Sequence, residues 1–336
     1  MPFGVPDFHA FHIEQGLVYF YKNDFHTALV EFDRALQISD SAMARYNRAH
    51  ALLALGRYAE AWPAFESRFE VYGVYGDGLT FTETGHRLRR TLPQWNGEPG
   101  RRVVLLHEAG FGDTVMFLRF VRPLREAHVP LVLDVPEPLR ALASQCASLG
   151  DDGDAWFSMF DLPALLDPVI PAPPYLARPD TGLIAYWACK IFNGHARRIG
   201  IAWSSNTNHN GEHEHQTRSL PLAEFLDLLP FEGALFSLQH HDRAEAERLG
   251  VHVPELQDFA DVAALASLMD VVVSIDTAAL HVAGAIGHPN VFAMLPWAPT
   301  WRWHAGNRWY PQIKLCCAQA PGDWPSAFAQ IAEQTK

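Results

Sequence analysis

The stretch Val271-Val272-Val273-Ser274-Ile275-Asp276-Thr277-Ala278-Ala279-Leu280-His281 decides the fold class of this chain. Its first five residues form an apolar, mostly β-branched run, which is typical of a strand covered on both faces. We expect a helix directly after it with Asp276 as the N-cap, and an open helix N-terminus is a favourable site for an anion. Thr277 and His281 stand four residues apart and therefore share one face near that end. The same residues also fit a capped helix with a histidine in the core.

A second strand, turn and helix of the same kind lies far upstream. Val103-Val104-Leu105-Leu106 is an apolar run, and Gly110-Phe111-Gly112-Asp113 follows shortly after it. Two glycines one residue apart allow a tight turn and a close approach of the backbone to a ligand. The dinucleotide fingerprint is incomplete, because its third glycine and its downstream ribose-binding acid are missing. We expect Asp113 at the carboxyl end of a parallel strand, where open α/β sheets bind ligands, although it equally suits a helix cap.

Apolar runs alternate with helical patterns over most of the chain, as in a protein with parallel sheets. Residues 171–180 are rich in proline and indicate a stiff linker between two α/β halves. Two such halves that face each other form a cleft, which is a common place for a small-molecule site. The expected strands are 103–106, 131–135, 199–203, 234–238, 271–275 and 291–295, and the expected helices are 137–149, 222–229, 244–249 and 262–269.

The first part of the chain is helical and repetitive. Small residues recur 33 positions apart, and so do aromatic residues; the pairs are Gly16 with Ala49, Ala28 with Ala61, and Phe32 with Phe65. Small residues let the two helices of a pair approach closely, while the aromatic rings fill the space between pairs. The pattern resembles the tetratricopeptide repeat, although only about two units are visible and an independent array needs about three. The segment is either a docking surface for a protein partner or acceptor, or a helical cap on the domain that follows.

Composition limits the classes of function. The chain has 336 residues, of which 49% are hydrophobic, and a net charge of −12, so it is long enough for two or three domains with cores of their own. Its acidity, without a block of Lys and Arg, argues against nucleic acid as a partner. Four cysteines without a C-x-x-C pair suit a reducing compartment and provide no metal framework. No leader pattern or spanning apolar run is visible, so we expect a cytoplasmic protein with at most peripheral membrane association.

Together these motifs resemble a known enzyme family. The Gly110–Asp113 turn, the run from Asp276 through His281 to Ala283, and Gly287-His288-Pro289 are similar to the heptosyltransferase-type glycosyltransferases of family 9. The N-terminal repeats, Trp95-Asn96-Gly97-Glu98 and Trp301-Arg302-Trp303 resemble a bacterial branch that fuses tetratricopeptide repeats to such a transferase.

This resemblance implies a GT-B fold, in which two Rossmann-like domains hold a nucleotide-sugar between them, mostly by the C-terminal domain. The implied domains are a repeat segment at 1–75, an N-terminal Rossmann-like domain with its linker at 76–180, and a nucleotide-sugar domain at 181–336. Members of the family act without a bound metal or cofactor and invert the anomeric centre. The sugar donor is then a substrate, and the acceptor is a hydroxyl group of a glycan or a protein.

The resemblance also implies roles for individual residues. Asp113 matches the proposed general base, in an acceptor-side loop with Gly110 and Gly112. Asp276, Thr277 and His281 match the motif that meets the donor, where amides and the helix dipole stabilise the departing diphosphate. Arg218 is the candidate cation against that diphosphate. Family members with heptose donors carry a lysine there, so the arginine leaves the identity of the donor open.

Further polar residues follow the strands of the C-terminal half. Ser204 and Asn206 are candidates to contact phosphate or ribose, and Gln239 to line the nucleobase site; all three also fit ordinary turns. His209, His213 and His215 fit a solvated loop or lid better than a metal site. The tryptophans at 297, 301, 303 and 309 are interpreted as packing residues, with a sugar or acceptor platform as the alternative.

The sequence thus predicts an inverting, metal-independent glycosyltransferase with a short repeat segment. One alternative is a non-catalytic scaffold, in which the repeats recruit a partner and the transferase domain is degenerate. Another is a GT-B sugar-nucleotide epimerase, which would consume its donor without an acceptor. The nucleotide, the sugar, the acceptor and the oligomeric state stay open.

Overall fold

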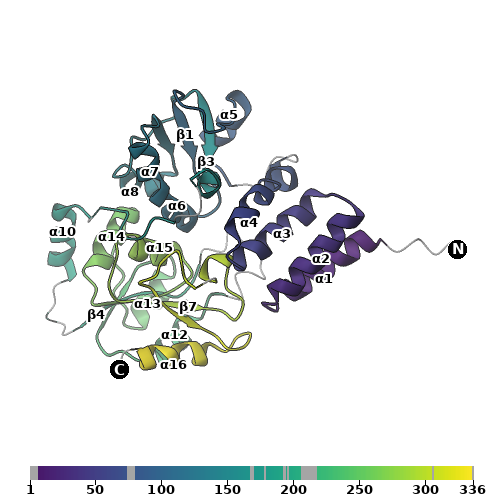
Figure 1. The fold of residues 1–336 in the computed structure, drawn as a ribbon. Helices are drawn as coiled ribbons and strands as arrows, with labels where there is room; N and C mark the ends of the chain where they lie inside the picture. Colours follow the sequence, from purple (N-terminus) through teal and green to yellow (C-terminus); the bar gives the residue numbers. More distant parts are fainter. Residues whose placement is uncertain are drawn as a thin grey trace. The chain divides into compact units, whose positions relative to one another are not determined.

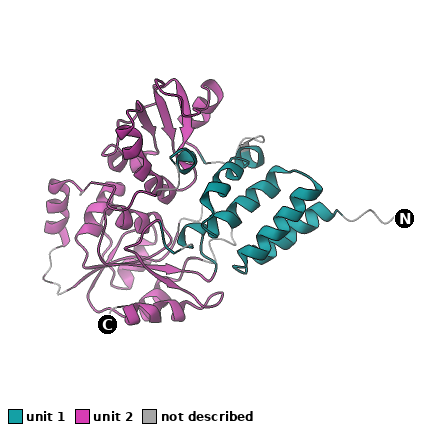
Figure 2. Ribbon diagram, viewed as in Figure 1, with its two compact units in different colours: residues 1–80, 161–169, 298–308 teal, residues 81–160, 170–297, 309–336 magenta. Residues whose placement is uncertain are grey.

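The computed structural model describes residues 7–73, 80–166, 170–177, 179–191, 194, 197–205, 218–304 and 306–334. The chain divides into two compact units, shown in separate colours in Figure 2. Unit 1 comprises Met1–Thr80, Asp161–Val169 and Ala298–Arg308, and unit 2 comprises Phe81–Phe160, Ile170–Trp297 and Trp309–Lys336. Both predicted α/β halves fall in unit 2, so the boundary expected between them at residue 180 stays a prediction.

Unit 1 is a helical array in which consecutive helices pack side by side (Figure 1). Side chains cap the first three of its helices, because Asp7, Asp24 and Ser41 each accept a hydrogen bond from an amide in the first turn. The helices are α1 (Phe8–Phe20), α2 (Phe25–Ile38), α3 (Ala42–Ala54) and α4 (Tyr58–Phe65), followed by η1 (Phe69–Gly73), α9 (Leu162–Leu165) and η5 (Trp301–Trp303).

The repeat positions lie in the interior of this array. Ala28, Phe32 and Ala49 have no exposed surface, and Phe65 is 3% exposed. A Cβ atom on Gly16 would lie 2.3 Å from Phe32 Cε1, so α1 and α2 approach too closely there for any side chain. Small and aromatic residues therefore act as the sequence predicts, while membership of the tetratricopeptide class stays a prediction.

Unit 2 contains a three-stranded sheet, sheet A, with the order β2-β1-β3. All of its strands are parallel, and Val103 in β1 pairs with Leu131 in β2 and with Ala155 in β3. The strands are β1 (Val103–Leu106), β2 (Leu131–Asp134) and β3 (Ala155–Ser158). The first two were predicted, and β3 was not.

A second parallel sheet in unit 2, sheet B, has the order β5-β4-β6-β7-β8. Two of its predicted strands have the predicted bounds, β6 (Val271–Ile275) and β7 (Val291–Leu295). The others are β4 (Arg198–Ala202), β5 (Ala234–Ser237) and the unpredicted edge strand β8 (Lys314–Cys317). Ile199 in β4, Val273 in β6 and Phe292 in β7 have no exposed surface, because helices cover both faces of the sheet. The prediction of a mixed α/β protein with parallel sheets is confirmed.

The helices of unit 2 connect these strands. The helix predicted at 137–149 is wrong in length: only η3 (Glu137–Leu139) and α8 (Arg140–Ala143) form before the chain turns. The remaining helices are α5 (Glu83–Thr91), α6 (Phe111–Phe117), η2 (Leu118–Phe120), α7 (Val121–Glu126), η4 (Met159–Asp161, whose last residue belongs to unit 1), α10 (Thr181–Ile191), α12 (Leu222–Leu228), α13 (Arg243–Arg248), α14 (Phe259–Ser267), α15 (Ala278–Ala285) and α16 (Trp324–Gln334).

The proline-rich segment expected as a linker packs against the C-terminal half of unit 2. The amides of Tyr175 and Leu176 both donate hydrogen bonds to the carbonyl of Ala285, the last residue of α15. The Tyr175 hydroxyl lies 2.9 Å from that of Tyr310. The segment is therefore held by specific contacts, which its composition does not reveal.

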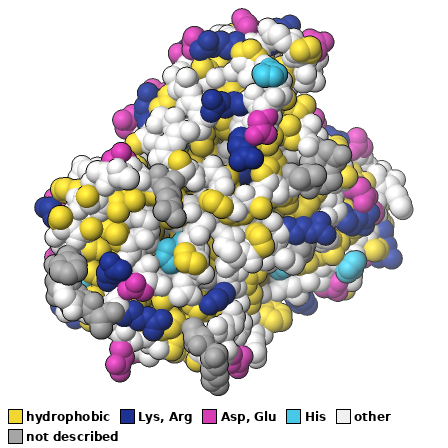
Figure 3. All heavy atoms as spheres, turned by 60° about the vertical axis from the view of Figure 1, so that its left-hand side comes forward, with side chains coloured by type: hydrophobic (Ala, Val, Ile, Leu, Met, Phe, Trp, Pro, Cys, Tyr) yellow, Lys and Arg dark blue, Asp and Glu magenta, His cyan; other side chains and the backbone are white. Residues whose placement is uncertain are grey.

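The surface is mixed in charge. On the face drawn in Figure 3, Lys and Arg side chains lie in small groups with Asp and Glu side chains nearby, and no broad basic area is seen. Within the described ranges, no helix is both long and apolar enough to cross a bilayer.

Candidate functional site

Each sheet of unit 2 has one point where the strand order reverses. In sheet A the chain leaves β1 for β2 on one side and returns to β3 on the other, and in sheet B it does the same around β4, with β5 and β6. Ligands of open α/β sheets bind outside the carboxyl ends of the strands at such switch points. The switch points lie between β1 and β3 and between β4 and β6, and most of the predicted site residues follow β1, β4 or β6.

At the sheet B switch point, Ser204 and Ser205 follow β4, and Asp276 and Thr277 follow β6. Ala202 and Ser274 are register partners, so the two turns start side by side. The Ser274 hydroxyl lies 3.2 Å from Thr277 Oγ1 and holds that side chain beside the end of its own strand. Thr277 remains partly exposed, which makes it the residue of this turn that a ligand can reach.

Asp276 does not cap the helix, which corrects the prediction. Helix α15 begins at Ala278 with Thr277 as the N-cap residue, and the Thr277 side chain forms no cap hydrogen bond. Asp276 instead contacts His281, with 3.3 Å between Oδ1 and Nε2. Both side chains are buried, at 5% and 3% exposed. The Asp276 carboxylate and the His281 imidazole thus support the first turn of α15 from the interior. We expect both to affect a ligand indirectly, by holding that turn in place.

The turn after β1 meets α15 at Gly112. A Cβ atom on Gly112 would lie 2.6 Å from His281 Cδ2 and 3.4 Å from Ala278 Cα. Only glycine fits there without displacing the imidazole, so the Gly-x-Gly pattern has a packing reason. Close by, the exposed ring of Phe111 contacts Phe259 at the start of α14, with 5.4 Å between ring centroids. The structure therefore brings the two predicted turns together within unit 2.

Asp113 lies in the first turn of α6, partly exposed. Its Oδ2 accepts a hydrogen bond of 3.0 Å from the amide of Gly110, which is the N-cap residue, so the carboxylate helps to close the turn. The residue before Gly110 is Ala109, with φ +67°, a left-handed conformation that costs a non-glycine residue roughly 1 kcal/mol. Backbone strain of this kind collects at functional sites, and here it sets the position of the acidic turn.

A second acid, Glu108, lies two residues after the end of β1 and is buried at 3% exposed. Its Oε2 accepts a hydrogen bond from the hydroxyl of Ser158, at the end of β3. Beside it, His107 Nδ1 lies 2.5 Å from Thr114 Oγ1. These buried groups join the strand ends of sheet A to α6, and they leave Asp113 as the more accessible acid of the turn.

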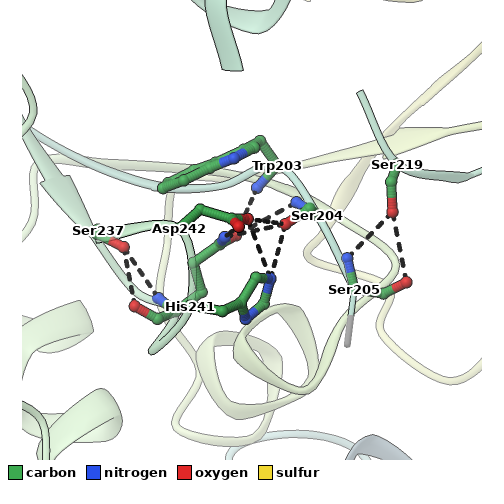
Figure 4. Close-up of polar contacts among 8 residues, drawn as sticks. Trp203, Ser204, Ser205, Ser219, Ser237, His241 and Asp242 are labelled. Atoms are coloured by element: carbon green, nitrogen blue, oxygen red, sulfur yellow. Dashed lines mark hydrogen bonds and ion pairs between the residues drawn. The ribbon is translucent and has the colours of Figure 1, made fainter. Parts of the chain in front are cut away.

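A polar cluster ties the end of β4 to the end of β5 (Figure 4). Gln239 Oε1 accepts hydrogen bonds from the amides of Trp203 and Ser204, at 2.9 and 3.2 Å. Its Nε2 donates to Ser204 Oγ at 3.0 Å. Gln239 is 6% exposed, and its side-chain amide is hydrogen-bonded within the protein. It therefore links the end of β4 to the end of β5.

His241 and Asp242 complete this cluster, and the sequence analysis did not select them. Ser204 Oγ lies 2.6 Å from His241 Nε2 and 2.8 Å from Asp242 Oδ2. The carboxylate lies 3.6 Å from that same Nε2. In a nucleophilic triad the acid would hold the opposite ring nitrogen, Nδ1, so this arrangement is not a hydrolase triad. Ser204, His241 and Asp242 instead form a polar cluster beside the switch point of sheet B.

Arg218 reaches the same edge of sheet B from just before α12. Its Nε donates to Ser205 Oγ at 3.2 Å, and Ser219 Oγ accepts from the Ser205 amide at 3.1 Å. The predicted cation therefore lies at the turn that follows β4. Asn206 and the histidines at 209, 213 and 215 lie outside the described residues. Within the described part of the chain, no cluster of three His, Cys, Asp or Glu side chains suits a metal ion.

The late tryptophans are divided between the two units. Trp301 is buried in unit 1, with its ring centroid 5.7 Å from that of Trp62. Trp309 has no exposed surface and packs edge-on against Phe117 in unit 2. The interpretation as packing residues is confirmed for these two.

Sequence reasoning missed a group behind the site, formed by the buried Arg119 and Tyr310 and the partly exposed Tyr175. The Arg119 guanidinium lies over both tyrosine rings, 4.5 and 4.8 Å from their centroids, and 5.1 Å from the ring of Trp309. The Tyr310 hydroxyl lies 3.0 Å from His281 Nδ1. An arginine within an otherwise apolar run, Met116 to Val121, is the one sequence signal that pointed to this group.

Comparisons with known proteins add remote relatives. No protein-family model matches the chain. Protein FlbA of Caulobacter vibrioides is 28% identical over an alignment of 379 residues, which covers 97% of this chain and 61% of FlbA. The chain thus spans about three-fifths of the length of that relative. The structure of E. coli ADP-heptose LPS heptosyltransferase II is similar over 70% of this chain and 99% of that chain, with 12% identity and a TM-score of 0.45. At that distance the likeness carries no argument about this chain.

Proposed function

We propose that unit 2 is an inverting, metal-independent glycosyltransferase of the GT-B type, which moves a sugar from a nucleotide-sugar donor to a hydroxyl group of a glycan or protein. One observation supports this most: two parallel sheets meet at their switch-point turns, where Gly112 of one turn contacts His281 beside the other. An acid on one side and a helix N-terminus on the other are what a direct displacement at a sugar needs.

On the donor side, Thr277 and the first amides of α15 would face the diphosphate, with Asp276 and His281 bracing the turn from inside. The positive end of the helix dipole favours a group that gains negative charge as it leaves. Arg218, held near the end of β4 by Ser205, would supply the full positive charge that a metal supplies in other transferases. Ser204 and Gln239 would shape the neighbouring edge rather than bind the base directly.

On the acceptor side, Asp113 would act as the general base. The acceptor oxygen attacks the anomeric carbon from the face opposite the diphosphate, the bond from that carbon to the diphosphate oxygen breaks, and the acceptor proton passes to Asp113. Attack from the opposite face inverts the anomeric centre. The hydrogen bond from the Gly110 amide holds the Asp113 carboxylate in the turn.

The substitution Asp113→Asn tests this role. We expect transfer to fall by about 10²–10⁴-fold, the usual contribution of a general base, while the affinity for the donor stays within about threefold. Release of the nucleotide is measured with ADP-, UDP- and GDP-sugars, which release the nucleoside diphosphate, and with CMP-sugars, which release CMP; each is tested with glycan and protein fractions as acceptors. Asp24→Asn, at the N-cap of α2, controls for the loss of one carboxylate. Turnover by Asp113→Asn within tenfold of the wild type would remove Asp113 from the role of base.

The same assay separates the alternatives. Donor consumption that needs no acceptor would favour a sugar-nucleotide epimerase. Failure of every donor and every free nucleotide to bind would favour a scaffold, and the search would then turn to protein partners of unit 1.

A further inference from the structure

A line of hydrogen-bonded side chains runs through the interior of unit 2 to the start of α15. Arg119 Nη2 lies 3.4 Å from the Tyr175 hydroxyl, which lies 2.9 Å from the Tyr310 hydroxyl. The Tyr310 hydroxyl lies 3.0 Å from His281 Nδ1, and His281 Nε2 lies 3.3 Å from Asp276 Oδ1. The line joins η2, the proline-rich segment, the segment before β8 and the start of α15, so segments far apart in the sequence meet in it.

The chemistry of the two ends favours one direction for the hydrogen bonds in this line. A guanidinium can only donate, and an ionised carboxylate can only accept. Arg119 therefore donates to Tyr175, whose single O–H is left to donate to Tyr310. Tyr310 in turn donates to His281 Nδ1, which must be the bare nitrogen, and the proton on Nε2 points at Asp276. For a neutral imidazole, the reverse order would place the proton on Nδ1 and leave a bare Nε2 facing the Asp276 carboxylate.

Arg119 is suited to be the fixed positive end. It is 1% exposed, and its other N–H groups donate to the carbonyls of Met116, Trp309 and Pro171. Among the residues that the structure describes, no carboxylate pairs with Arg119. Backbone carbonyl oxygens and aromatic faces stabilise its charge instead. Burial raises the pKa values of Tyr175 and Tyr310 against the opposing effect of that charge, so both hydroxyls keep the protons that the line requires at neutral pH.

We propose that Tyr310 is a positioning residue, which holds His281 in the Nε2–H tautomer so that the imidazole secures Asp276 under the donor-binding turn. This inference rests on the proposed function for its purpose, because that turn is the one expected to meet the diphosphate. Without the hydroxyl, the neutral ring is free to place its proton on Nδ1. A bare Nε2 would then face the Asp276 carboxylate, two acceptors would oppose each other, and the turn would lose its internal support.

The substitution Tyr310→Phe removes the hydroxyl and keeps the ring, which packs closely on α15: a Cβ atom on Gly284 would lie 2.5 Å from its Cδ1. The tautomer of His281 is read from the long-range ¹⁵N–¹H NMR spectrum of the histidine-labelled protein, assigned by the signals lost in His281→Gln. We expect a protonated Nε2 and a bare Nδ1 in the wild type, and mixed tautomers in Tyr310→Phe. Tyr186→Phe, an exposed tyrosine of α10, is the matched control and should leave His281 unchanged.

Affinity for the nucleoside diphosphate gives the second readout. We expect Tyr310→Phe to weaken it by about tenfold, the value of one well-placed hydrogen bond, and Tyr186→Phe to leave it unchanged. A wild-type His281 protonated on Nδ1, or a tautomer that stays the same in Tyr310→Phe, would overturn the proposal. If the tautomer responds and no nucleotide binds to any variant, the positioning role stands and the proposed glycosyltransferase function fails.

Discussion

The contact between Gly112 and His281 gives the sharpest prediction, because it joins the two turns on which the site depends. In Gly112→Ala the new Cβ would lie 2.6 Å from His281 Cδ2, about 1 Å inside ordinary contact. His281 is 3% exposed and is held on its other atoms by Tyr310 and Asp276, so it has little room to move. Overpacking of this kind costs about 1–3 kcal/mol.

Replacing glycine by alanine within a helix otherwise stabilises by about 0.5–1 kcal/mol. We therefore expect Gly112→Ala to lower the free energy of unfolding by about 1–2 kcal/mol. Apart from the imidazole, the nearest atom to the new Cβ is Ala278 Cα at 3.4 Å, which is ordinary contact. In the His281→Ala background the same substitution should be neutral or slightly stabilising, which gives a coupling free energy of about 2 kcal/mol.

The assay is urea unfolding of the four proteins of this double-mutant cycle, followed by tryptophan fluorescence. Gly182→Ala is the matched control, since Gly182 is also the second residue of its helix, α10. Its Cβ would meet only the flexible carboxylate of Asp180, at 3.0 Å. Additivity of the two substitutions within about 0.5 kcal/mol would refute the contact, because independent sites add within that margin.

Three further predictions concern single groups. Arg218→Ala should weaken binding of the nucleoside diphosphate by at least tenfold, measured by calorimetry, and Arg218→Lys by less, since a charge-assisted hydrogen bond contributes about 1.5–3 kcal/mol. Equal affinities of Arg218→Ala and the wild type would exclude a contact between Arg218 and phosphate. Burial, with the nearby charge of Arg302, lowers the pKa of His50 from 6.5 to about 4. The native state therefore takes up this proton at a lower pH than the unfolded state does. As the pH drops from 6.5 towards 4, the free energy of unfolding should fall by about 2 kcal/mol more in the wild type than in His50→Phe. If the urea midpoints of the two proteins changed in parallel with pH, this prediction would be wrong. Gly16→Ala would place its Cβ 2.3 Å from Phe32 and should lower the thermal midpoint by several degrees; an unchanged midpoint would show that α1 does not pack as described.

The fold was predictable where burial on both faces leaves a continuous apolar run. Strands β1, β6 and β7 have the predicted bounds because every residue in them is buried. Strand β3 follows the polar stretch Asp151–Asp154, and β8 is an edge strand with partly exposed residues that begins at Lys314. Neither has the length or the pattern that marks a central strand, so the sequence did not reveal them.

The site was predictable in its turns and not in its contacts. A Gly-x-Gly after a strand and an acid before a helix indicate switch-point turns, and the structure brings both together at Gly112. The sequence could not decide between a cap and a tertiary contact for Asp276, because that depends on where the helix begins. The contact between Arg119 and Trp309 spans 190 positions, and no local pattern predicts it.

Binding of a nucleotide without metal tests the central claim most directly. The measurement is a thermal-shift screen of the purified protein against ADP-, UDP-, GDP- and CMP-sugars and their free nucleotides, with and without Mg²⁺, repeated with Arg218→Ala. We predict that one nucleotide class raises the unfolding temperature independently of Mg²⁺, because a ligand that binds only the native state stabilises it, and that the shift is smaller in Arg218→Ala. No shift with any of them, or a shift that requires Mg²⁺ and ignores Arg218, would contradict the account.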